Sequence, residues 1–456
     1  RNNPNGRLLA IVLDGTLYSA PQLKQPIRNG RAEISGNFSY EEASFLANIL
    51  KAGSLPAPVN IVERRVVDPT LGSDTIRSGV AAGGPALKTT IPGDLQPVWV
   101  SQGPDAAKGW GAGSPVVADG RVYVYATMPD QDPGNVVHCF DLETGKEVWR
   151  RDLAGKNKDY GSHGTPAVAE GKVVVGGPAG ELWCLDAKTG ADLWNKAKGG
   201  QGPGSSSPLI HNGTVFCGNG KVTAFALADG ALRWSTPGGS DCCSPTLWRH
   251  GEESFVVTLL EKPGTVVCLR ASDGTSVWQQ VLDGELKKTT PAIHGDVLAV
   301  TGSKGLFVLR LATDKATLIG QTADGVSGHG GAAPINAGTS IYHGVRGGCV
   351  RLDITDQGLK EVWRSKAVVR DGYATPVLAG GIIFGLASLK GVTKEEGTYA
   401  YPISYTSLVL VDAATGKELG NLGAKLGICM VSPCVADGRV VIRGPKGLAC
   451  FDLRDK

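Results

Sequence analysis

The fold is decided by the stretch from Ser114 to Trp149, which reads SPVVADGRVYVYATMPDQDPGNVVHCFDLETGKEVW. A Ser-Pro step opens a short apolar strand, the pair Asp119-Gly120 supplies a tight turn, and a second apolar strand follows. Asp-Gly suits a hairpin because both central residues of such a turn need positive φ. A third strand ends in a turn that contains Asp141 and Gly145, and a fourth strand carries Trp149. The stretch predicts four consecutive antiparallel strands.

This pattern recurs eight times along most of the chain, with an average spacing of about 45 residues, which is the range of a propeller blade. The turn Asp-x-x-Thr-Gly with Trp four residues after its Gly is clearest at Asp141 and Asp186, and Leu318 and Leu419 stand where the fifth and seventh copies would have Trp. Seven of the eight prolines follow Ser or Thr, and Pro334 follows Ala333. The prolines are Pro115, Pro166, Pro208, Pro245, Pro291, Pro334, Pro376 and Pro433.

The two ends of the repeated region complement each other. The eighth copy stops at residues 452–456, before its fourth strand, whereas Pro97-Val98-Trp99-Val100 precedes the first copy and looks like an isolated fourth strand. Pairing of these ends would close the ring and remove an exposed sheet edge. We therefore predict a mainly β fold, in which residues 95–456 form one eight-bladed β-propeller with four-stranded blades. Two insertions, near 130–135 and 390–405, lengthen loops of blades one and seven.

Residues 1–79 do not share the period and predict a separate small α+β module, followed by a Gly/Ala/Pro-rich linker over residues 80–94. Leu8 to Leu13 is an apolar strand, Asp14-Gly15 a hairpin turn, and Thr16 to Ser19 the start of the return strand. Residues 40–52 predict a helix with a capping box at its start, and residues 59–67 predict a further strand.

Composition excludes several classes of protein. The 456 residues carry a formal net charge of +3, spread evenly on both sides of residue 94, so nucleic acid is not expected as a partner. The uncharged stretch over residues 372–389 is interrupted by Pro376 and by Gly380-Gly381 and belongs to the repeat, so no transmembrane helix is predicted. The sequence starts at Arg1 rather than Met and shows no signal-peptide pattern, so we expect a fragment or a processed form.

The N-terminal module resembles the periplasmic region of the protein-export subunit SecD. The matching segments are LAIVLDG at 9–15, SAP at 19–21, GRAEISGNF at 30–38, EA at 42–43, LKAGSLPAP at 50–58 and PTLGSD at 69–74. In that family the match continues into membrane helices that couple proton flow to protein translocation, and here it stops near residue 79. The resemblance implies an extracytoplasmic module that touches a translocating chain or a translocase, and not transport activity by itself.

Residues 95–456 resemble the pyrroloquinoline-quinone-like propellers through the Asp-x-x-Thr-Gly-x-x-x-Trp turns at Asp141 and Asp186 and through the eight-fold count. In this superfamily the Trp residues dock neighbouring blades. Some members are quinoprotein dehydrogenases that hold the quinone and Ca²⁺ on the propeller axis. Others, such as the outer-membrane assembly factor BamB, bind no cofactor and recruit proteins. The repeat indicates the fold and leaves both functions open.

The loops that lead into the first strand of each blade should approach the central axis, so the residues before each Pro are candidates for a ligand or peptide site. A water-filled, partly plugged funnel is the alternative. The candidates are Trp110, His163, Cys242, Cys243, Lys288, His329, Tyr373 and Met430.

Adjacent cysteines at 242 and 243 occur as a vicinal disulfide beside the quinone in some quinoprotein alcohol dehydrogenases. A Ca²⁺-quinone pocket also needs hard oxygen ligands, a carboxylate base and a flat aromatic ring. Asp241, Glu285 and Asp371 could supply oxygens and Trp110 could stack, but no family motif surrounds them. The alternative is that both thiols fill space at a blade junction.

Four other cysteines, Cys139, Cys184, Cys268 and Cys450, occupy one position of the repeat and predict packing rather than disulfides. The Trp residues at 149, 194, 234, 278 and 363 predict core contacts between blades for the same reason. Histidine spacing predicts no metal site, and no catalytic residue is assigned.

The leading hypothesis is an extracytoplasmic, non-enzymatic protein without a cofactor, whose SecD-like module and propeller bind polypeptide, translocase or envelope proteins during export or envelope assembly. The alternative is a quinoprotein oxidoreductase that uses pyrroloquinoline quinone with Ca²⁺ to oxidise alcohols or sugars. A third interpretation is that a fragmentary gene model joined two unrelated parts, because the resemblance changes abruptly near residue 80.

Overall fold

The computed structural model divides the chain into two compact units, residues 1–64 and 65–456, which are described separately. The structure describes short strands within residues 7–23 and Leu87 in the N-terminal quarter. In the remainder it describes most residues of the sheets and their shorter turns. The described ranges there are 95–101, 113–127, 134–154, 164–177, 180–196, 206–218, 220–236, 243–261, 263–286, 289–323, 333–345, 348–366, 375–386, 405–428, 431–444 and 447–454.

The first unit contains two small antiparallel ladders. Strands β2 (Ile11–Leu13) and β3 (Thr16–Ser19) form the hairpin that the sequence predicts around Asp14-Gly15. Strands β1 (Arg7–Leu8) and β4 (Gln22–Leu23) form the second pair. The predicted helix over 40–52 and the predicted strand over 59–67 lie outside the described residues.

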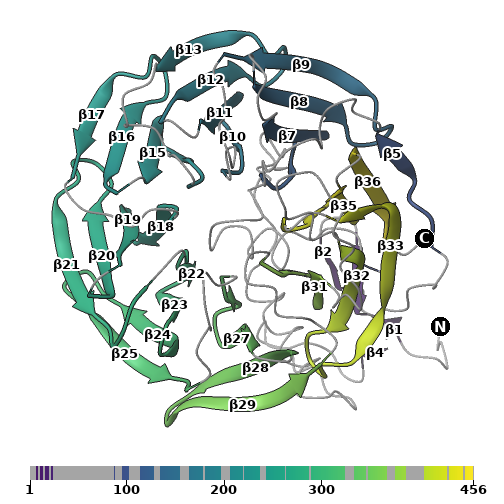
Figure 1. Cartoon of the computed structure of the whole chain (residues 1–456). Helices are drawn as coiled ribbons and strands as arrows, with labels where there is room; N and C mark the ends of the chain where they lie inside the picture. The colour runs from purple at the N-terminus through teal and green to yellow at the C-terminus, as the bar shows by residue number, and fades with distance from the viewer. Residues whose placement is uncertain are drawn as a thin grey trace, which may run out of the picture. The chain divides into compact units, whose positions relative to one another are not determined.

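The second unit is a ring of eight four-stranded antiparallel sheets, and in seven of them the strands follow the chain from the innermost to the outermost (Figure 1). Blade 1 contains β6 (Val116–Ala118), β7 (Arg121–Thr127), β8 (Asn135–Asp141) and β9 (Glu147–Leu153). Blade 2 contains β10 (Ala167–Ala169), β11 (Lys172–Gly176), β12 (Leu182–Asp186) and β13 (Asp192–Lys196). Blade 3 contains β14 (Leu209–His211), β15 (Thr214–Gly218), β16 (Val222–Ala226) and β17 (Leu232–Ser235). Blade 4 contains β18 (Thr246–His250), β19 (Glu253–Leu260), β20 (Thr265–Arg270) and β21 (Ser276–Val281).

The remaining blades repeat this order. Blade 5 contains β22 (Ala292–His294), β23 (Val297–Gly302), β24 (Gly305–Leu311) and β25 (Ala316–Gln321). Blade 6 contains β26 (Ile335–Asn336), β27 (Ser340–Val345), β28 (Gly348–Thr355) and β29 (Gly358–Ser365). Blade 7 contains β30 (Val377–Ala379), β31 (Ile382–Leu386), β32 (Tyr405–Asp412) and β33 (Glu418–Ile428). Blade 8 contains β34 (Cys434–Ala436), β35 (Arg439–Gly444), β36 (Gly447–Asp452) and, as its outer strand, β5 (Trp99–Ser101).

Strand β5 closes the ring as the sequence predicts. It pairs antiparallel with β36, so that Trp99 lies opposite Cys450. The N–H of Val98 also donates to the carbonyl of Cys450 at 2.7 Å. The prediction of an eight-bladed propeller with four-stranded blades is therefore confirmed for the second unit. The two predicted insertions lie largely outside the described residues.

The hairpin between the first two strands of a blade has the geometry that its sequence requires. Asp119 and Gly120 have φ values of 49° and 70°, and Asn212 has 46° before its own glycine. Both central residues of such a turn must be left-handed, which Asn, Asp and Gly tolerate best. The inner strands then bury nearly all their side chains, whereas the outer strand of blade 1 exposes five of its seven residues. The apolar core consequently lies between neighbouring blades.

A docking tryptophan on the outer strand joins six of the eight pairs of neighbouring blades, which confirms the prediction of core contacts. In each case the indole Nε1 donates to a backbone carbonyl of the next blade at 2.8–3.1 Å. The glycine of that blade's turn packs against the indole at five of these junctions, so closely that a Cβ on Gly190 would lie 2.6 Å from the Trp149 ring. The six are Trp99, Trp149, Trp194, Trp234, Trp278 and Trp363.

The four repeat cysteines fill the space beside these rings. Each lies opposite a docking tryptophan on the neighbouring strand, as Cys139 does with Trp149 and Cys184 with Trp194. All four are buried free thiols. A small side chain is needed opposite a large ring, so the prediction of packing cysteines is confirmed.

Leu87 lies in the stretch predicted to be a linker, and it contacts the propeller. It forms an isolated antiparallel bridge with Arg454 and packs against the apolar cluster between blades 7 and 8. A Cβ on Gly380 would lie 2.8 Å from the Leu87 side chain. At least this residue of the stretch is therefore an ordered part of the second unit.

Candidate functional site

The sequence places the candidate site at the axial end of the propeller, in the loops that enter each inner strand. Of the eight candidate residues, Cys243 is described. The other seven lie outside the described residues, as do Asp241 and Asp371. They are Trp110, His163, Cys242, Lys288, His329, Tyr373 and Met430. Their convergence on the axis therefore stays a prediction.

Cys243 points into the core and not into the open axis. Its side chain is fully buried, and it packs in the apolar cluster between blades 4 and 5 together with Leu286 and Trp248. Its Sγ donates to the carbonyl of Ser244 at 3.6 Å. This position is the one expected for a thiol that fills space at a blade junction.

Glu285, considered above as an oxygen ligand, lies in a loop that backbone hydrogen bonds fix in place. Its N–H donates to Ser303 Oγ and its carbonyl accepts from the N–H of Ser303, both at 2.9 Å. The N–H of the following Leu286 donates to the carbonyl of Glu261 at 3.3 Å. The loop from blade 4 to blade 5 is thus held by the hairpin loops of both blades, and the half-buried Glu285 has a defined place above them.

The Ser or Thr before each proline forms a hydroxyl belt that joins the inner strands. In this belt the N–H of one blade donates to the side-chain hydroxyl of the same position in the next blade. The donors and acceptors are Ser432 to Ser114, Ser114 to Thr165, Thr165 to Ser207, Ser207 to Ser244, Ser244 to Thr290, and Ala333 to Thr375, with lengths of 2.9–3.2 Å. The belt therefore fixes the start of each inner strand, and with it the base of each axial loop.

The hydroxyl belt is interrupted at two places, and the same two places lack a docking tryptophan. Ala333 has no hydroxyl to accept from the N–H of Thr290, and within the described residues no such bond joins Thr375 to Ser432. These are the junctions of blades 5/6 and 7/8. The strand register corrects the expectation that Leu318 and Leu419 stand at the Trp position: Gly320 lies opposite Val308 and Gly420 opposite Leu410, as Trp149 lies opposite Cys139. We call these two the leucine junctions, after the leucines in the apolar clusters that join their blades, and the other six the docked junctions. Blades 6 and 7 consequently form a pair bounded by a leucine junction on either side.

Apolar contacts replace the missing bonds at the leucine junctions. Between blades 5 and 6 a cluster forms around Val297, Leu306, Ile341 and Leu352, and Leu318 itself is 48% exposed. Asn336, which is fully buried, adds a polar link: its Nδ2 donates to the carbonyls of Ala292 at 3.1 Å and Val297 at 2.8 Å in blade 5.

Between blades 7 and 8 the cluster is larger and includes Phe384, Leu410 and Phe451, with Leu419 and Leu87 packed against it. These contacts have no strict direction. Sliding of one blade over the next therefore costs less there than at a junction held by hydrogen bonds.

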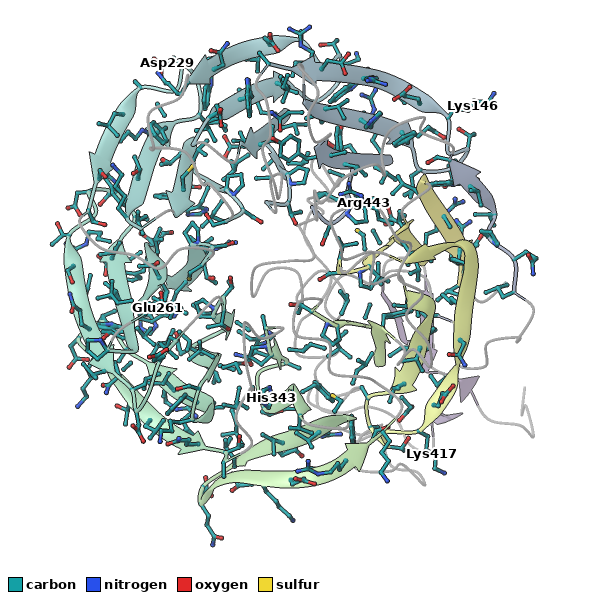
Figure 2. The ribbon with its side chains drawn as sticks, in the orientation of Figure 1. Lys146, Asp229, Glu261, His343, Lys417 and Arg443 are labelled. Atoms are coloured by element: carbon teal, nitrogen blue, oxygen red, sulfur yellow. The ribbon has the colours of Figure 1, made fainter. Side chains whose placement is uncertain are left out.

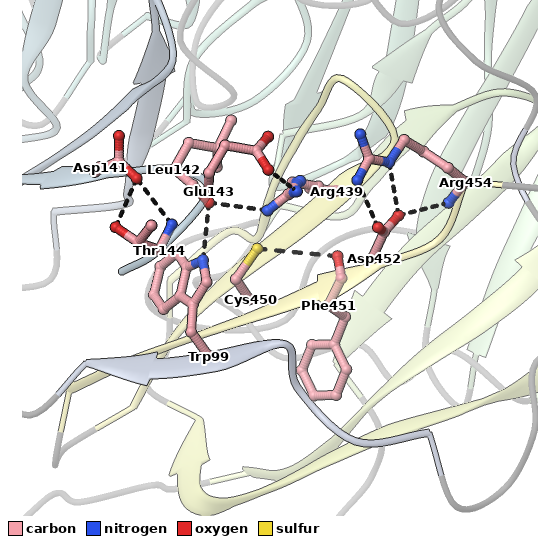
Figure 3. A network of polar contacts seen from close by, with 10 residues as sticks. All are labelled: Trp99, Asp141, Leu142, Glu143, Thr144, Arg439, Cys450, Phe451, Asp452 and Arg454. Carbon is pink, nitrogen blue, oxygen red and sulfur yellow. Dashed lines mark hydrogen bonds and ion pairs between the residues drawn. The ribbon is translucent and has the colours of Figure 1, made fainter. Parts of the chain in front are cut away.

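The ring-closing junction, between blades 8 and 1, is strengthened by a charged residue that the sequence did not indicate (Figure 3). Trp99 Nε1 donates to the carbonyl of Leu142 at 2.8 Å, and the buried Arg439 donates to the same carbonyl at 3.0 Å. The second guanidinium nitrogen of Arg439 forms an ion pair with Glu143. The junction that joins the two ends of the ring therefore combines the indole hydrogen bond with the bonds of a buried guanidinium.

A second buried arginine lies nearer the axis of the same junction. Figure 2 shows Arg443, Glu261 and His343 on the inner side of the ring, whereas Lys146, Asp229 and Lys417 lie at its perimeter. Arg443 is 2% exposed, and its guanidinium donates to the carbonyls of Gly113 and, at 3.1 Å, of Tyr125 in blade 1. Its positive charge is therefore solvated by backbone carbonyls close to the belt residue Ser114.

Burial favours the neutral forms of several thiols and of one histidine in the described core. Burial raises the pKa of Cys139, Cys184 and Cys268 to about 12, so these thiols do not act as nucleophiles near neutral pH. Burial also lowers the pKa of His138, although its Nδ1 lies 2.6 Å from Glu147. Such groups stabilise packing and supply no reactive centre.

Two properties of the described residues bear on membranes and metals. In the part of the chain that the structure describes, no helix has the length and apolarity needed to cross a bilayer. Among the same residues, no three His, Cys, Asp or Glu side chains cluster in a way that could hold a metal ion.

Family comparison identifies both parts of the chain. Residues 89–242 and 244–455 match the family described as "Outer membrane protein assembly factor BamB", and residues 1–57 match "SecDF, P1 head subdomain". The N-terminal residues are 54% identical over 81 residues to the protein translocase subunit SecD of Calditerrivibrio nitroreducens, and 56% identical over 75 residues to that of Desulfurispirillum indicum. The matched part spans 16% and 15% of these two SecD subunits.

Solved structures confirm the propeller fold. BamB from Moraxella catarrhalis aligns with a TM-score of 0.58 at 15% identity, covering 78% of this chain and 96% of that one. Quinohemoprotein alcohol dehydrogenase from Comamonas testosteroni aligns with a TM-score of 0.53 at 17% identity, covering 84% and 82%. At this identity the likeness shows the architecture, which both protein classes share. Both resemblances suggested by the sequence are thereby confirmed.

Proposed function

We propose, from the premise that this chain belongs to the BamB family, that it is an extracytoplasmic scaffold that binds polypeptide during protein export or envelope assembly. The observation that carries the proposal is the presence of a SecDF P1 head match and a BamB match in one chain. Each region is named for a protein that handles other polypeptides outside the cytoplasm. A fusion places the two at one location, which raises the effective concentration of one module near a client of the other.

The chemistry of the described propeller residues supports binding. The hydroxyl belt and the docking tryptophans use their polar groups in contacts between blades, and the thiols beside them are neutral. What they form is a rigid ring that presents loops on one end and outer strands at its perimeter. Loops and strand edges on a rigid scaffold are the elements that peptides bind.

The quinoprotein alternative requires a cofactor-binding pocket on the propeller axis. Pyrroloquinoline quinone with Ca²⁺ would need several oxygen ligands from the axial loops, and Glu285 is the described carboxylate there. Cys243 is buried in the core between blades 4 and 5, where its thiol packs against apolar side chains. We therefore retain the cofactor-free scaffold as the proposal and use the quinone as its test.

Two titrations of the full chain separate the functions. In the first, a fluorescently labelled outer-membrane protein is diluted from urea into the purified chain, and anisotropy is followed; the same protein in its folded form is the control. We expect saturable binding of the unfolded form alone. Failure to bind at high micromolar concentration would overturn the polypeptide-binding proposal.

In the second titration, pyrroloquinoline quinone and Ca²⁺ are added while quinone absorbance and the melting temperature are recorded. A ligand that binds the folded state must raise the apparent stability. We expect no change in either signal. Saturable binding together with a higher melting temperature would replace the scaffold by an oxidoreductase and call for assays of alcohol and sugar oxidation.

A further inference from the structure

The perimeter of the propeller consists of eight outer strands, each of which is the edge of its sheet (Figure 1). An edge strand presents unpaired backbone N–H and C=O groups that another extended chain can pair with. Natural proteins protect such edges with charged side chains, with prolines or by keeping the strand short. The outer strands of this ring differ in how far they are protected.

Six of the eight outer strands carry one of these protections. Strand β9 contains four charged residues, and β13, β29 and β33 contain charges of both signs. Strand β17 has four residues and includes Arg233, and β5 has three residues. The two exceptions are β21, with the sequence SVWQQV, and β25, with ATLIGQ. Each has six residues and no charge, and they belong to the consecutive blades 4 and 5.

The unprotected edges also expose apolar side chains. Val281 on β21 is 58% exposed, the largest value for any bulky apolar residue that the structure describes, and Leu318 on β25 is 48% exposed. Trp278 on β21 is buried, and its indole N–H donates to the carbonyl of Ala312 in blade 5. Strand β21 is thus fixed to blade 5 through its buried Trp, while its exposed residues, Ser276, Gln279 and Val281, carry no charge.

The backbone of β21 points usable groups outward. The N–H of Leu282 bonds to the carbonyl of Gly264, so by the alternation of an antiparallel pair the N–H and C=O of Gln279 and Val281 turn away from β20. The carbonyl of Val281 accepts a hydrogen bond from the side chain of Gln280 at 2.9 Å. A side-chain amide there occupies the position that the N–H of an added strand would take.

We propose that the outer edges of β21 and β25 bind an extended, uncharged segment of a partner polypeptide by strand addition. This inference rests on the proposed function and deepens it, because it assigns polypeptide binding to the perimeter at blades 4 and 5. Main-chain hydrogen bonds to an edge give affinity, and alternate side chains give selectivity. The chemistry of the edge specifies the occupant: the groups to be satisfied are main-chain donors and acceptors, and the absence of charge favours a segment that alternates small polar and β-branched residues. Charged strands on either side, β17 with Arg233 and β29 with Lys360, confine the site to these two blades.

The test uses full-length chain and a labelled peptide whose uncharged core alternates Thr and Val, with binding followed by fluorescence anisotropy. The double variant Val281→Lys/Leu318→Lys places a charge on each edge. The matched control, Val148→Lys/Leu193→Lys, changes side chains that are 44% and 46% exposed on β9 and β13, which already carry charges. We expect the edge variant to weaken binding about tenfold or more, which corresponds to about 1.4 kcal/mol, and the control to change it less than twofold.

A second variant separates backbone pairing from side-chain contact. Gln279→Pro removes an outward N–H and leaves the hydrogen bonds to β20 in place, and proline is tolerated at such edge positions. We expect it to weaken peptide binding as strongly as the charges do while the melting temperature stays close to wild type. Full binding by Gln279→Pro would show that no strand is added.

The outcomes distinguish this inference from the function on which it rests. If wild type binds the peptide and unfolded outer-membrane protein, and all variants bind equally well, the perimeter site is wrong and the polypeptide-binding function stands. If wild type binds neither, both are wrong. If the variants abolish a dimer seen by sedimentation and not peptide binding, the edge joins two copies of this chain, and the proposal is overturned.

Discussion

The docked junctions and the leucine junctions both hold neighbouring blades together, but they use different interactions. Each docked junction within blades 1 to 5 has an indole hydrogen bond on its outer side and a hydroxyl hydrogen bond on its inner side. The 5/6 and 7/8 junctions lack both and rely on apolar clusters, with Asn336 as the polar link at 5/6. The two devices are lost together although they lie in different strands. Directional bonds at both ends of an interface fix the angle between blades, whereas apolar contact alone fixes only their distance.

The largest expected effect comes from removing a docking tryptophan. Trp278→Ala deletes a side chain that is 7% exposed, packs in the cluster of blades 4 and 5, and donates to Ala312, so we expect a loss of about 3–5 kcal/mol. The comparison at a leucine junction is Leu318→Ala on the outer strand of blade 5, which removes a half-exposed side chain and should cost less than about 1 kcal/mol. Urea unfolding followed by fluorescence and circular dichroism measures both. Equal losses would erase the distinction between the two kinds of junction.

A glycine substitution tests how tightly the indole is held. Gly190→Ala places a Cβ 2.6 Å from the Trp149 ring at a φ of +74°, whereas Gly171→Ala meets open space at a nearly equal φ of +70°. The backbone cost is shared and amounts to about 1 kcal/mol. The additional clash at Gly190 should raise the loss to about 2–4 kcal/mol. The difference between the melting temperatures of the two variants measures the effect of the clash with the Trp149 ring. Identical melting temperatures would show that the ring is not tightly held against Gly190.

The hydroxyl belt predicts a smaller loss at a docked junction. Ser207→Ala leaves the buried N–H of Thr165 without its acceptor, which should cost about 1–2 kcal/mol. The control is Ser235→Ala, which removes a hydroxyl that bonds only to the side chain of Thr223 on the same blade. A loss at Ser235 as large as that at Ser207 would show that the belt adds nothing to ordinary hydroxyl contacts.

The converse change adds a belt bond to a leucine junction. Ala333→Ser supplies a hydroxyl opposite the N–H of Thr290, as in the five blades where the belt is continuous. We expect a gain of about 0.5–1 kcal/mol and slower hydrogen exchange in the inner strands of blade 6. The reference variant is Ala337→Ser on the same blade, away from the belt. A destabilised Ala333→Ser chain would mean that the gap in the belt is required for packing.

The smallest effect is a dependence on acid. The Arg454 guanidinium beside Asp452, next to the ring-closing junction, holds the pKa of that carboxyl well below its usual range, and Thr189 lowers the pKa of Asp186 at a docked turn. A carboxyl whose pKa is lower in the folded state stabilises the fold above the unfolded value near 3.8, and this contribution is lost as the pH falls below it. Asp452→Asn should therefore flatten the decline of the melting temperature between about pH 5 and 2 more than Asp186→Asn. Parallel curves for the two variants would contradict the stronger role of Asp452.

The repeated features of the molecule were predictable from the sequence. The Asp-Gly and Asn-Gly turns, the spacing of the prolines and the isolated strand before the first copy indicated eight blades and the way the ring closes. The loss of Trp from the fifth and seventh copies was also predictable, but the residue at its position was not: the register places Gly320 and Gly420 there, and not Leu318 and Leu419. Such patterns can be recognised in a sequence because backbone geometry and blade packing require similar residues at the same position of each repeat.

The residues of the hydroxyl belt are visible in the sequence, but the hydrogen bonds between them are not. The Ser or Thr before each proline marks the repeat, and Ala333 is the exception. The hydrogen bond that each hydroxyl accepts, however, comes from a residue in another blade. Such a bond has no local signal. The same reason hid Arg439 and Arg443, whose partners lie about three hundred residues away in sequence. The axial candidates lie in loops whose sequences do not repeat from blade to blade, so no second copy supports their assignment.

The strand that closes the ring is made first and used last. Strand β5 lies at residues 99–101, and its partner β36 is completed only at residue 452. During synthesis the earlier blades can assemble in order, because each packs on the blade before it, while β5 has no paired strand until β36 is made. A ribosome that stalls anywhere before blade 8 releases an open ring, which exposes an unfinished sheet edge to quality control. A mechanical force applied to the residues that precede β5 would act directly on this closure. Three paired residues of β5 and the hydrogen bonds of Trp99 and Arg439 hold the ring together there.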